Sequence, residues 1–230
     1  MTKLLISVKN VEESQVARYA GVDLIDLKDP AVGALGALDI DTVRQIVNEV
    51  NGSALVSATV GEGHATIEAL TDDIALYASL GVDIVKISVS ELFQQADFFS
   101  KIVQLTSQGI KVVTVFFADN ELDFGLIPHL QKSGCYGAML DTQLKQSSLL
   151  AAQPIETLRG FVSVCAENKL VSGLAGSVNK QHVVALKGLN PGFIGMRGGV
   201  CHQHDRTSEL VYEQIAAVKA MLLYCNAASD

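Results

Sequence analysis

Short apolar runs alternate along the chain with longer segments in which apolar residues recur every three or four positions. The short runs predict buried strands, and the longer segments predict amphipathic helices. Gly21, Gly81 and Gly109 each stand between a predicted helix and the next strand, where helix-ending glycines are common. We predict strands at residues 1–8, 24–30, 54–60, 84–89, 111–118, 134–142, 171–175 and 193–196. We predict helices at residues 11–20, 41–50, 65–80, 91–107, 127–132, 155–168, 180–188 and 208–224.

Strands and helices therefore alternate strictly, and no linker or run of charge divides the chain. Alternating units of this kind require a parallel sheet, and eight of them in 230 residues predict a closed (β/α)₈ TIM barrel. We expect one catalytic domain over residues 1–230. An open doubly wound sheet is the alternative, but a G-x-G-x-x-G motif does not follow the first strand.

Lysines and aspartates lie within or just after three of the predicted strands. Asp26 and Lys28 are two residues apart on one strand, so their side chains share a face. Lys86 lies on a second strand, Asp141 ends a third, and Lys145 follows it. Function in such barrels resides at the C-terminal ends of the strands. We therefore expect these five side chains to form one cluster at the mouth of the barrel.

This cluster has two interpretations. Buried charges are costly unless they are paired, so the residues could form structural salt bridges. Alternatively, a partly desolvated lysine among other lysines has a lowered pKa, and its free amine can attack a carbonyl group. The recurrence of the same residue types on separate strands favours amine chemistry.

Two glycine-rich turns follow the last two predicted strands. The first contains Gly176 and Ser177, and the second contains Arg197, Gly198 and Gly199. Loops at these positions of a barrel often hold a phosphate with backbone N–H groups, and glycine lets the backbone approach closely. We predict a substrate phosphate here, with Arg197 adding positive charge. Ordinary turn glycines are the alternative.

The composition narrows the classes of partner. Apolar residues make up 49% and charged residues 18% of the chain, with a net charge of −8 and a pI near 5.1. This charge argues against nucleic acid as a partner, although a local basic pocket can still bind phosphorylated metabolites. No apolar run approaches the roughly 18 residues of a membrane span, so we expect no membrane partner. Widely spaced cysteines fit reduced thiols in the cytoplasm; they are Cys135, Cys165, Cys201 and Cys225.

Residues 201–205 place two histidines, a cysteine and an aspartate within five positions. Zinc accepts all three residue types, but the spacing is too tight for a structural finger site and no partner pair stands out elsewhere. We expect a solvated loop here rather than a metal site.

Taken in order, the motifs of this chain resemble those of the (5-formylfuran-3-yl)methyl phosphate synthase family of methanofuran and methylofuran biosynthesis. The motifs are IDLKDP at 25–30, GALG at 33–36, VSATVG at 56–61, VK at 85–86, AMLDT at 138–142, LAGS at 174–177 and RG at 197–198. They span nearly the whole chain, and it is their combination that is specific. One departure is the segment 201–205, where we expect relatives to have more glycine and no histidine pair.

The resemblance implies a (β/α)₈ barrel that condenses two molecules of glyceraldehyde 3-phosphate into a furan aldehyde phosphate, with loss of phosphate and water. It implies a Schiff base on Lys28 and an acid–base role for Lys86, with Asp26, Asp141 and Lys145 at further charged positions. This scheme requires no cofactor and no metal. We also expect a homo-oligomer.

Two other functions fit the same residues. One is another phosphate-binding barrel enzyme, such as a class I aldolase or a sugar-phosphate isomerase or epimerase. The other is a metabolite-binding protein that holds its ligand without turnover. Borohydride trapping separates the isomerases and epimerases, which form no imine, and turnover of triose phosphate with phosphate release separates the binding protein.

Overall fold

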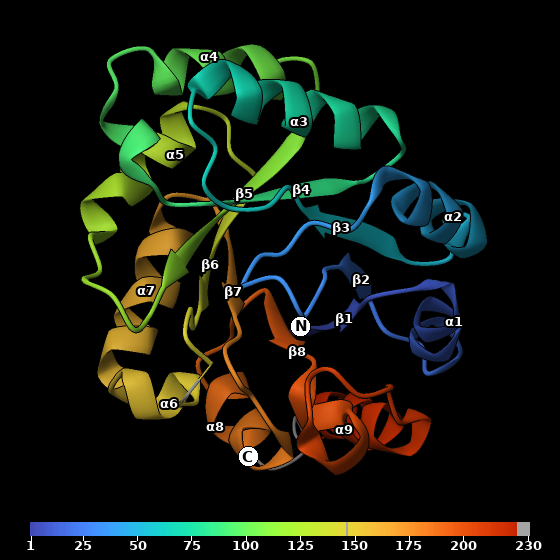
Figure 1. Ribbon diagram of the computed structural model, residues 1–230. Coiled ribbons are helices and arrows are strands. Elements are labelled where there is room, and N and C mark those ends of the chain that lie inside the picture. The colour runs from blue at the N-terminus through green and yellow to red at the C-terminus, as the bar shows by residue number, and fades with distance from the viewer. Residues whose placement is uncertain (146, 225–230) are drawn as a thin grey trace.

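A closed barrel of eight parallel strands forms the centre of the molecule (Figure 1). The computed structural model describes residues 1–145 and 147–224. The strands pair in sequence order, and β8 returns to β1 with Lys3 opposite Phe193. The strands are β1 (Lys3–Val8), β2 (Leu24–Leu27), β3 (Leu55–Thr59), β4 (Ile84–Ser88), β5 (Lys111–Phe117), β6 (Gly137–Asp141), β7 (Val171–Leu174) and β8 (Phe193–Met196). The predicted TIM barrel is confirmed.

Helices follow the strands and surround the barrel (Figure 1). They are α1 (Val11–Tyr19), α2 (Ile40–Val50), α3 (Ile67–Ser79), α4 (Phe98–Thr106), α5 (Ile127–Lys132), α6 (Leu149–Ala152), α7 (Ile155–Glu167), α8 (Val183–Lys187) and α9 (Tyr212–Tyr224). Side-chain caps fix several of their starts, because an oxygen of Asn10, Asp39 or Thr66 accepts a backbone N–H of the first turn. Among the described residues, no helix is long and apolar enough to cross a membrane.

Two predicted helices are wrong in their first part. Residues 91–94 form a separate 3₁₀ turn, and α4 begins only at Phe98, whose ring packs on Phe93 with 4.1 Å between centroids. At the end of the chain, Cys201 and Leu210 form an isolated β-bridge. This bridge holds the preceding residues in a loop, so α9 begins at Tyr212 rather than at 208.

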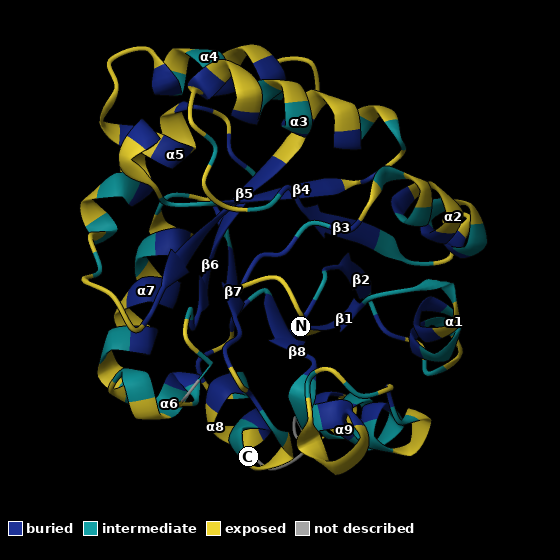
Figure 2. Ribbon diagram, in the orientation of Figure 1, coloured by how far each residue is buried: buried dark blue, intermediate teal, exposed yellow. Residues whose placement is uncertain are grey.

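The apolar core has two layers. A large layer lies between the strands and the helices, and a smaller one fills the inside of the barrel. Figure 2 shows the strands as mostly buried, whereas the helices expose their outer faces. Exceptions include Lys3 and Lys111, the exposed first residues of β1 and β5. Cys135, Cys165 and Cys201 are buried free thiols, and Cys225 lies outside the described residues.

Close packing inside the barrel explains the glycine on β7. A Cβ atom at Gly173 would lie 2.2 Å from the ring of Phe193 on β8. We therefore expect Gly173→Ala to lower the free energy of unfolding by about 1–3 kcal/mol, the usual cost of overpacking a core. Urea denaturation measures this change.

Gly160→Ala provides the matched control. Gly160 is an exposed residue within α7, and a Cβ atom there would meet nothing within 4 Å. This substitution is expected to raise stability by about 0.5–1 kcal/mol, because alanine is the better helix former. Equal effects of the two substitutions would show that the barrel interior tolerates the extra methyl group.

Candidate active site

A cavity of about 450 Å³ opens at the C-terminal ends of the strands. Its wall brings together every site residue expected from the sequence: Asp26, Lys28, Lys86, Asp141, Lys145, Gly176, Ser177, Arg197, Gly198 and Gly199. These residues come from β2, β4, β6 and the loops after β2, β6, β7 and β8. Closure of the barrel therefore assembles the predicted cluster.

The deepest polar contact in this cavity is an ion pair between Asp26 and Lys86. Lys86 Nζ lies 2.6 Å from Asp26 Oδ1, and both side chains are at most 2% exposed. Burial lowers the pKa of the Lys86 ammonium, and the carboxylate of Asp26 opposes that shift. Two hydroxyl groups complete the shell of the carboxylate: Ser7 Oγ donates to Oδ2 at 2.9 Å and Ser57 Oγ to Oδ1 at 2.7 Å.

Strand register places these groups at one level. Ser7 on β1 and Ser57 on β3 are the direct neighbours of Asp26 across the parallel ladder. Residues at the same level of neighbouring strands have side chains close together, so the three polar groups meet without any loop. Neither serine was identified from the sequence, although both stand on predicted strands.

Asp141 connects the two other lysines of the cavity. Its Oδ2 lies 3.6 Å from Lys28 Nζ, and its Oδ1 accepts hydrogen bonds from Lys145 Nζ and, at 2.7 Å, from the N–H of Thr142. Burial acts to raise the pKa of Asp141, but Lys145 and Lys28 outweigh burial and lower that pKa to about 2. The carboxylate is therefore ionised throughout the neutral range.

Lys145 differs from an ordinary surface lysine. Burial, together with the neighbouring charges of Lys28 and Arg206, lowers the pKa of its ammonium to about 8 against the opposing pull of Asp141. Its backbone lies in the left-handed region with φ of 56°, which is uncommon for a lysine. An amine with a pKa near 8 can both give and accept a proton near neutral pH.

The two glycine-rich turns pack against each other and against the end of β6. Gly176 has φ of 112°, and a Cβ atom there would lie 2.8 Å from the N of Thr142. A Cβ atom at Gly199 would lie 2.3 Å from the carbonyl oxygen of Val178. Glycine is thus required for the close approach of these backbones, and the turns line the cavity as a phosphate-binding loop would.

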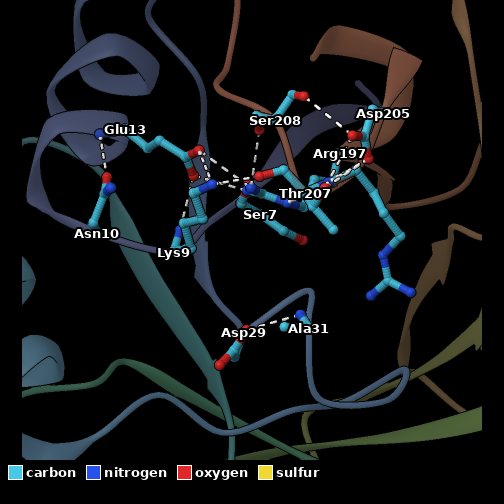
Figure 3. Close-up of polar contacts among 11 residues, drawn as sticks. Ser7, Lys9, Asn10, Glu13, Asp29, Ala31, Arg197, Asp205, Thr207 and Ser208 are labelled. Carbon is cyan, nitrogen blue, oxygen red and sulfur yellow. Dashed lines mark hydrogen bonds and ion pairs between the residues drawn. The ribbon is translucent and has the colours of Figure 1, made fainter. Parts of the chain in front are cut away.

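Arg197 is already bound within the protein (Figure 3). Its Nη1 and Nη2 donate to the carboxylate of Glu13 at 2.8 and 3.1 Å. Its Nη1 also donates to the carbonyl of Ser7 at 2.9 Å, and its Nε to that of Arg206 at 2.6 Å. These contacts occupy the guanidinium, so the geometry argues against the predicted role of Arg197 as a phosphate ligand and assigns it to holding the β8 loop.

The loop from 201 to 208, part of which we expected to be solvated, contributes three residues to the cavity, of which only Arg206 was not considered in the sequence. His204, Asp205 and Arg206 line the cavity. Gln203 and His204 have φ of 52° and 59°, a conformation that glycine adopts more easily. Within the described residues, no group of three or more His, Cys, Asp and Glu side chains could hold a metal ion.

A closed (β/α)₈ barrel with buried lysines and carboxylates at the C-terminal ends of its strands is the architecture of a TIM-barrel enzyme. Solved structures agree with this fold. Phosphoribosyl anthranilate isomerase from Thermus thermophilus superposes with a TM-score of 0.67 at 12% identity, covering 96% of this chain and 98% of that one. For 3-hexulose-6-phosphate synthase from Salmonella typhimurium the TM-score is 0.63 at 18% identity, covering 96% and 100%.

Sequence comparison is more specific than the fold. Residues 4–219 match the 4-HFC-P synthase family. The chain is 38% identical to a Methylorubrum extorquens protein that provisionally carries the name (5-formylfuran-3-yl)methyl phosphate synthase, covering 95% of this chain and 91% of that one. It is 32% identical to the synthase of that name from Methanococcus aeolicus, covering 92% and 95%. The chain therefore belongs to the 4-HFC-P synthase family, the synthases of methanofuran biosynthesis, and the resemblance of its motifs is confirmed.

The ion pair of Arg197 and Glu13 leads to a prediction about stability. Both side chains are at most 5% exposed, so Arg197→Ala leaves a buried carboxylate without its partner. Loss of one partner of such a pair typically costs about 3–5 kcal/mol. We expect the free energy of unfolding of Arg197→Ala to fall by that amount in urea denaturation.

Arg44→Ala is the control, because Arg44 is 53% exposed and pairs only with the exposed Asp41. Its effect should stay within about 1 kcal/mol. If Arg197→Ala had normal stability but bound substrate weakly, the result would support the original prediction that Arg197 binds phosphate.

Proposed function

We propose that the protein condenses two molecules of glyceraldehyde 3-phosphate into (5-formylfuran-3-yl)methyl phosphate, with loss of phosphate and water. This places it among the carbon–oxygen lyases that act on phosphates. The observation that carries the proposal is the cavity itself, in which three lysines and two aspartates meet beside two glycine-rich turns, in a chain of this family. The expected homo-oligomer stays a prediction.

Lys28 is the nucleophile in this proposal. Of the three lysines it has the longest ion-pair contact, 3.6 Å to Asp141, whereas the amine of Lys86 is held at 2.6 Å by Asp26. The Lys28 side chain is also less deeply buried than that of Lys86, 8% against 2% exposed. Its amine can therefore leave its partner and attack a substrate carbonyl with the least loss of pairing.

The imine on Lys28 then acts as an electron sink for a carbanion at the neighbouring carbon of the first triose. That carbanion attacks the carbonyl carbon of the second triose, which the same cavity holds in place. Lys86 and Lys145, with their carboxylate partners, transfer the protons of bond formation and elimination. Loss of phosphate and water closes the ring and makes it aromatic.

Incubation with glyceraldehyde 3-phosphate tests the proposed activity as a whole. A furan aldehyde should appear by ultraviolet absorbance and by mass, together with inorganic phosphate. A class I aldolase would form a sugar bisphosphate without releasing phosphate, and a binding protein would leave the substrate unchanged. Either result would contradict the proposal.

Lys28 is expected to carry the substrate after borohydride reduction. Peptide mass spectrometry should find a reduced triose phosphate on the peptide that contains Lys28. Lys28→Arg should lose both trapping and turnover, because a guanidinium group stays protonated and does not form an imine. Lys111→Arg is the matched control, since Lys111 is exposed at the opposite end of the barrel. Label on Lys86 or Lys145 would overturn the assignment.

Lys86 is expected to transfer protons without a covalent bond to the substrate. Lys86→Ala should keep the reduced adduct on Lys28 but lower kcat by about 10²- to 10⁴-fold, the usual contribution of a general acid or base. Lys86→Met fills most of the vacated volume, so agreement between the two variants attributes the loss to the amine rather than to a cavity. Near-normal turnover in both would contradict this role.

A further inference from the structure

Two triose phosphates bring two phosphate groups into one cavity, and we have assigned only one of them to the glycine-rich turns after β7 and β8. The lining of the cavity carries five lysine and arginine side chains and three carboxylates, in a chain whose net charge is −8. The cavity is thus a local basic site on an acidic protein, as an anionic substrate requires. The guanidinium of Arg197 is not available to bind the second phosphate, because Glu13 and backbone carbonyls already accept its hydrogen bonds.

Arg206 is the cationic side chain whose contacts leave it free for a ligand. It is half-buried in the wall of the cavity, and its Nη2 donates to the carbonyl oxygen of Gly33 at 3.0 Å. Within the described part of the chain, this is the one hydrogen bond of its guanidinium. The remaining N–H groups form a planar fork of the kind that binds a phosphate with two parallel hydrogen bonds.

The guanidinium of Arg206 is anchored outside the glycine-rich turns, at the carbonyl of Gly33. Arg206 starts in the loop after β8, and its side chain reaches the loop after β2, whose Ala34 and Leu35 N–H groups are held by Glu62 at 3.1 and 2.9 Å. In barrel order, β2 lies three strands from β7, so the guanidinium is anchored to a different loop from the two that carry the glycine-rich turns. Asp141 and Lys145 lie close enough for their charges to interact with that of Arg206.

We propose that Arg206 binds the phosphate monoester of the second triose phosphate, while the glycine-rich turns bind that of the first. This inference rests on the proposed function, because it is the condensation that requires two phosphates. By its bond to Gly33, Arg206 also connects the loops after β8 and β2, so the second substrate is held near Asp141 and Lys145. Arg206 thus selects a phosphorylated second substrate.

Substitution of Arg206 tests this directly. Arg206→Ala removes the guanidinium but keeps the backbone carbonyl that accepts from Arg197 Nε, so the loop retains that support. We expect the glyceraldehyde 3-phosphate concentration for half-maximal turnover to rise about 10- to 100-fold, the loss of one charge-assisted hydrogen bond. Arg206→Lys should recover part of the loss, because it keeps the charge without the fork. Arg159→Ala is the control, since Arg159 is 62% exposed on α7.

A binding measurement separates this inference from the proposed function. Titration with inorganic phosphate, followed by calorimetry, should give two sites for the unaltered chain and for Arg159→Ala, and one site for Arg206→Ala. If no furan forms but Arg206→Ala still loses one of two sites, the function fails and the site stands. If furan forms and Arg206→Ala turns over normally, the function stands and this inference is overturned. A single phosphate site in the unaltered chain also overturns it.

Discussion

The buried contact between Asp26 and Lys86 is the interaction on which the rest of the mouth depends. Transfer of two charges from water into a protein interior costs several kcal/mol for each ion, and their attraction offsets this only with good geometry and further hydrogen bonds. Ser7 and Ser57 supply those bonds to Asp26. A well-packed apolar pair is often as stable at such a position, so the pair is weak evidence for stability and fits the proposed role of Lys86 in proton transfer.

Strand register determines whether the side chains around this pair face the inside of the barrel. Side chains alternate between the two faces of a strand, so a slip of β2 by one residue would move Asp26 and Lys28 together to the helix-facing layer. Barrel closure fixes the register of all eight strands at once, and close glycine contacts such as that of Gly173 with Phe193 leave little room for another alignment. The fixed register of the barrel strands therefore also fixes the positions of the lysines.

The strands and the charged cluster could be predicted from the sequence, because both follow from local periodicity and from the position of residues relative to strand ends. The pairing of Arg197 with Glu13 could not, since the two are 184 positions apart and meet only when β8 closes on β1. The role of Arg206 could not be predicted either, because it lies in an irregular loop without periodicity. Only the structure shows that its side chain contacts Gly33. The sequence pattern predicts which charged residues are buried, but the closure of the barrel determines which residues they pair with.

Differences in environment give three chemically identical lysines different properties. Lys86 is enclosed with its carboxylate, Lys28 has the longest ion-pair contact, and Lys145 loses its proton near pH 8 because burial outweighs the pull of Asp141. A phosphate monoester carries its second charge above about pH 6. Between about pH 6 and pH 8 the substrate is therefore fully charged while Lys145 keeps its proton, and above that range the cavity loses a cation beside Arg206. In the proposed mechanism, the pKa of Lys145 thus couples substrate binding to proton transfer, because the ammonium that attracts the phosphate is also the proposed acid for the elimination.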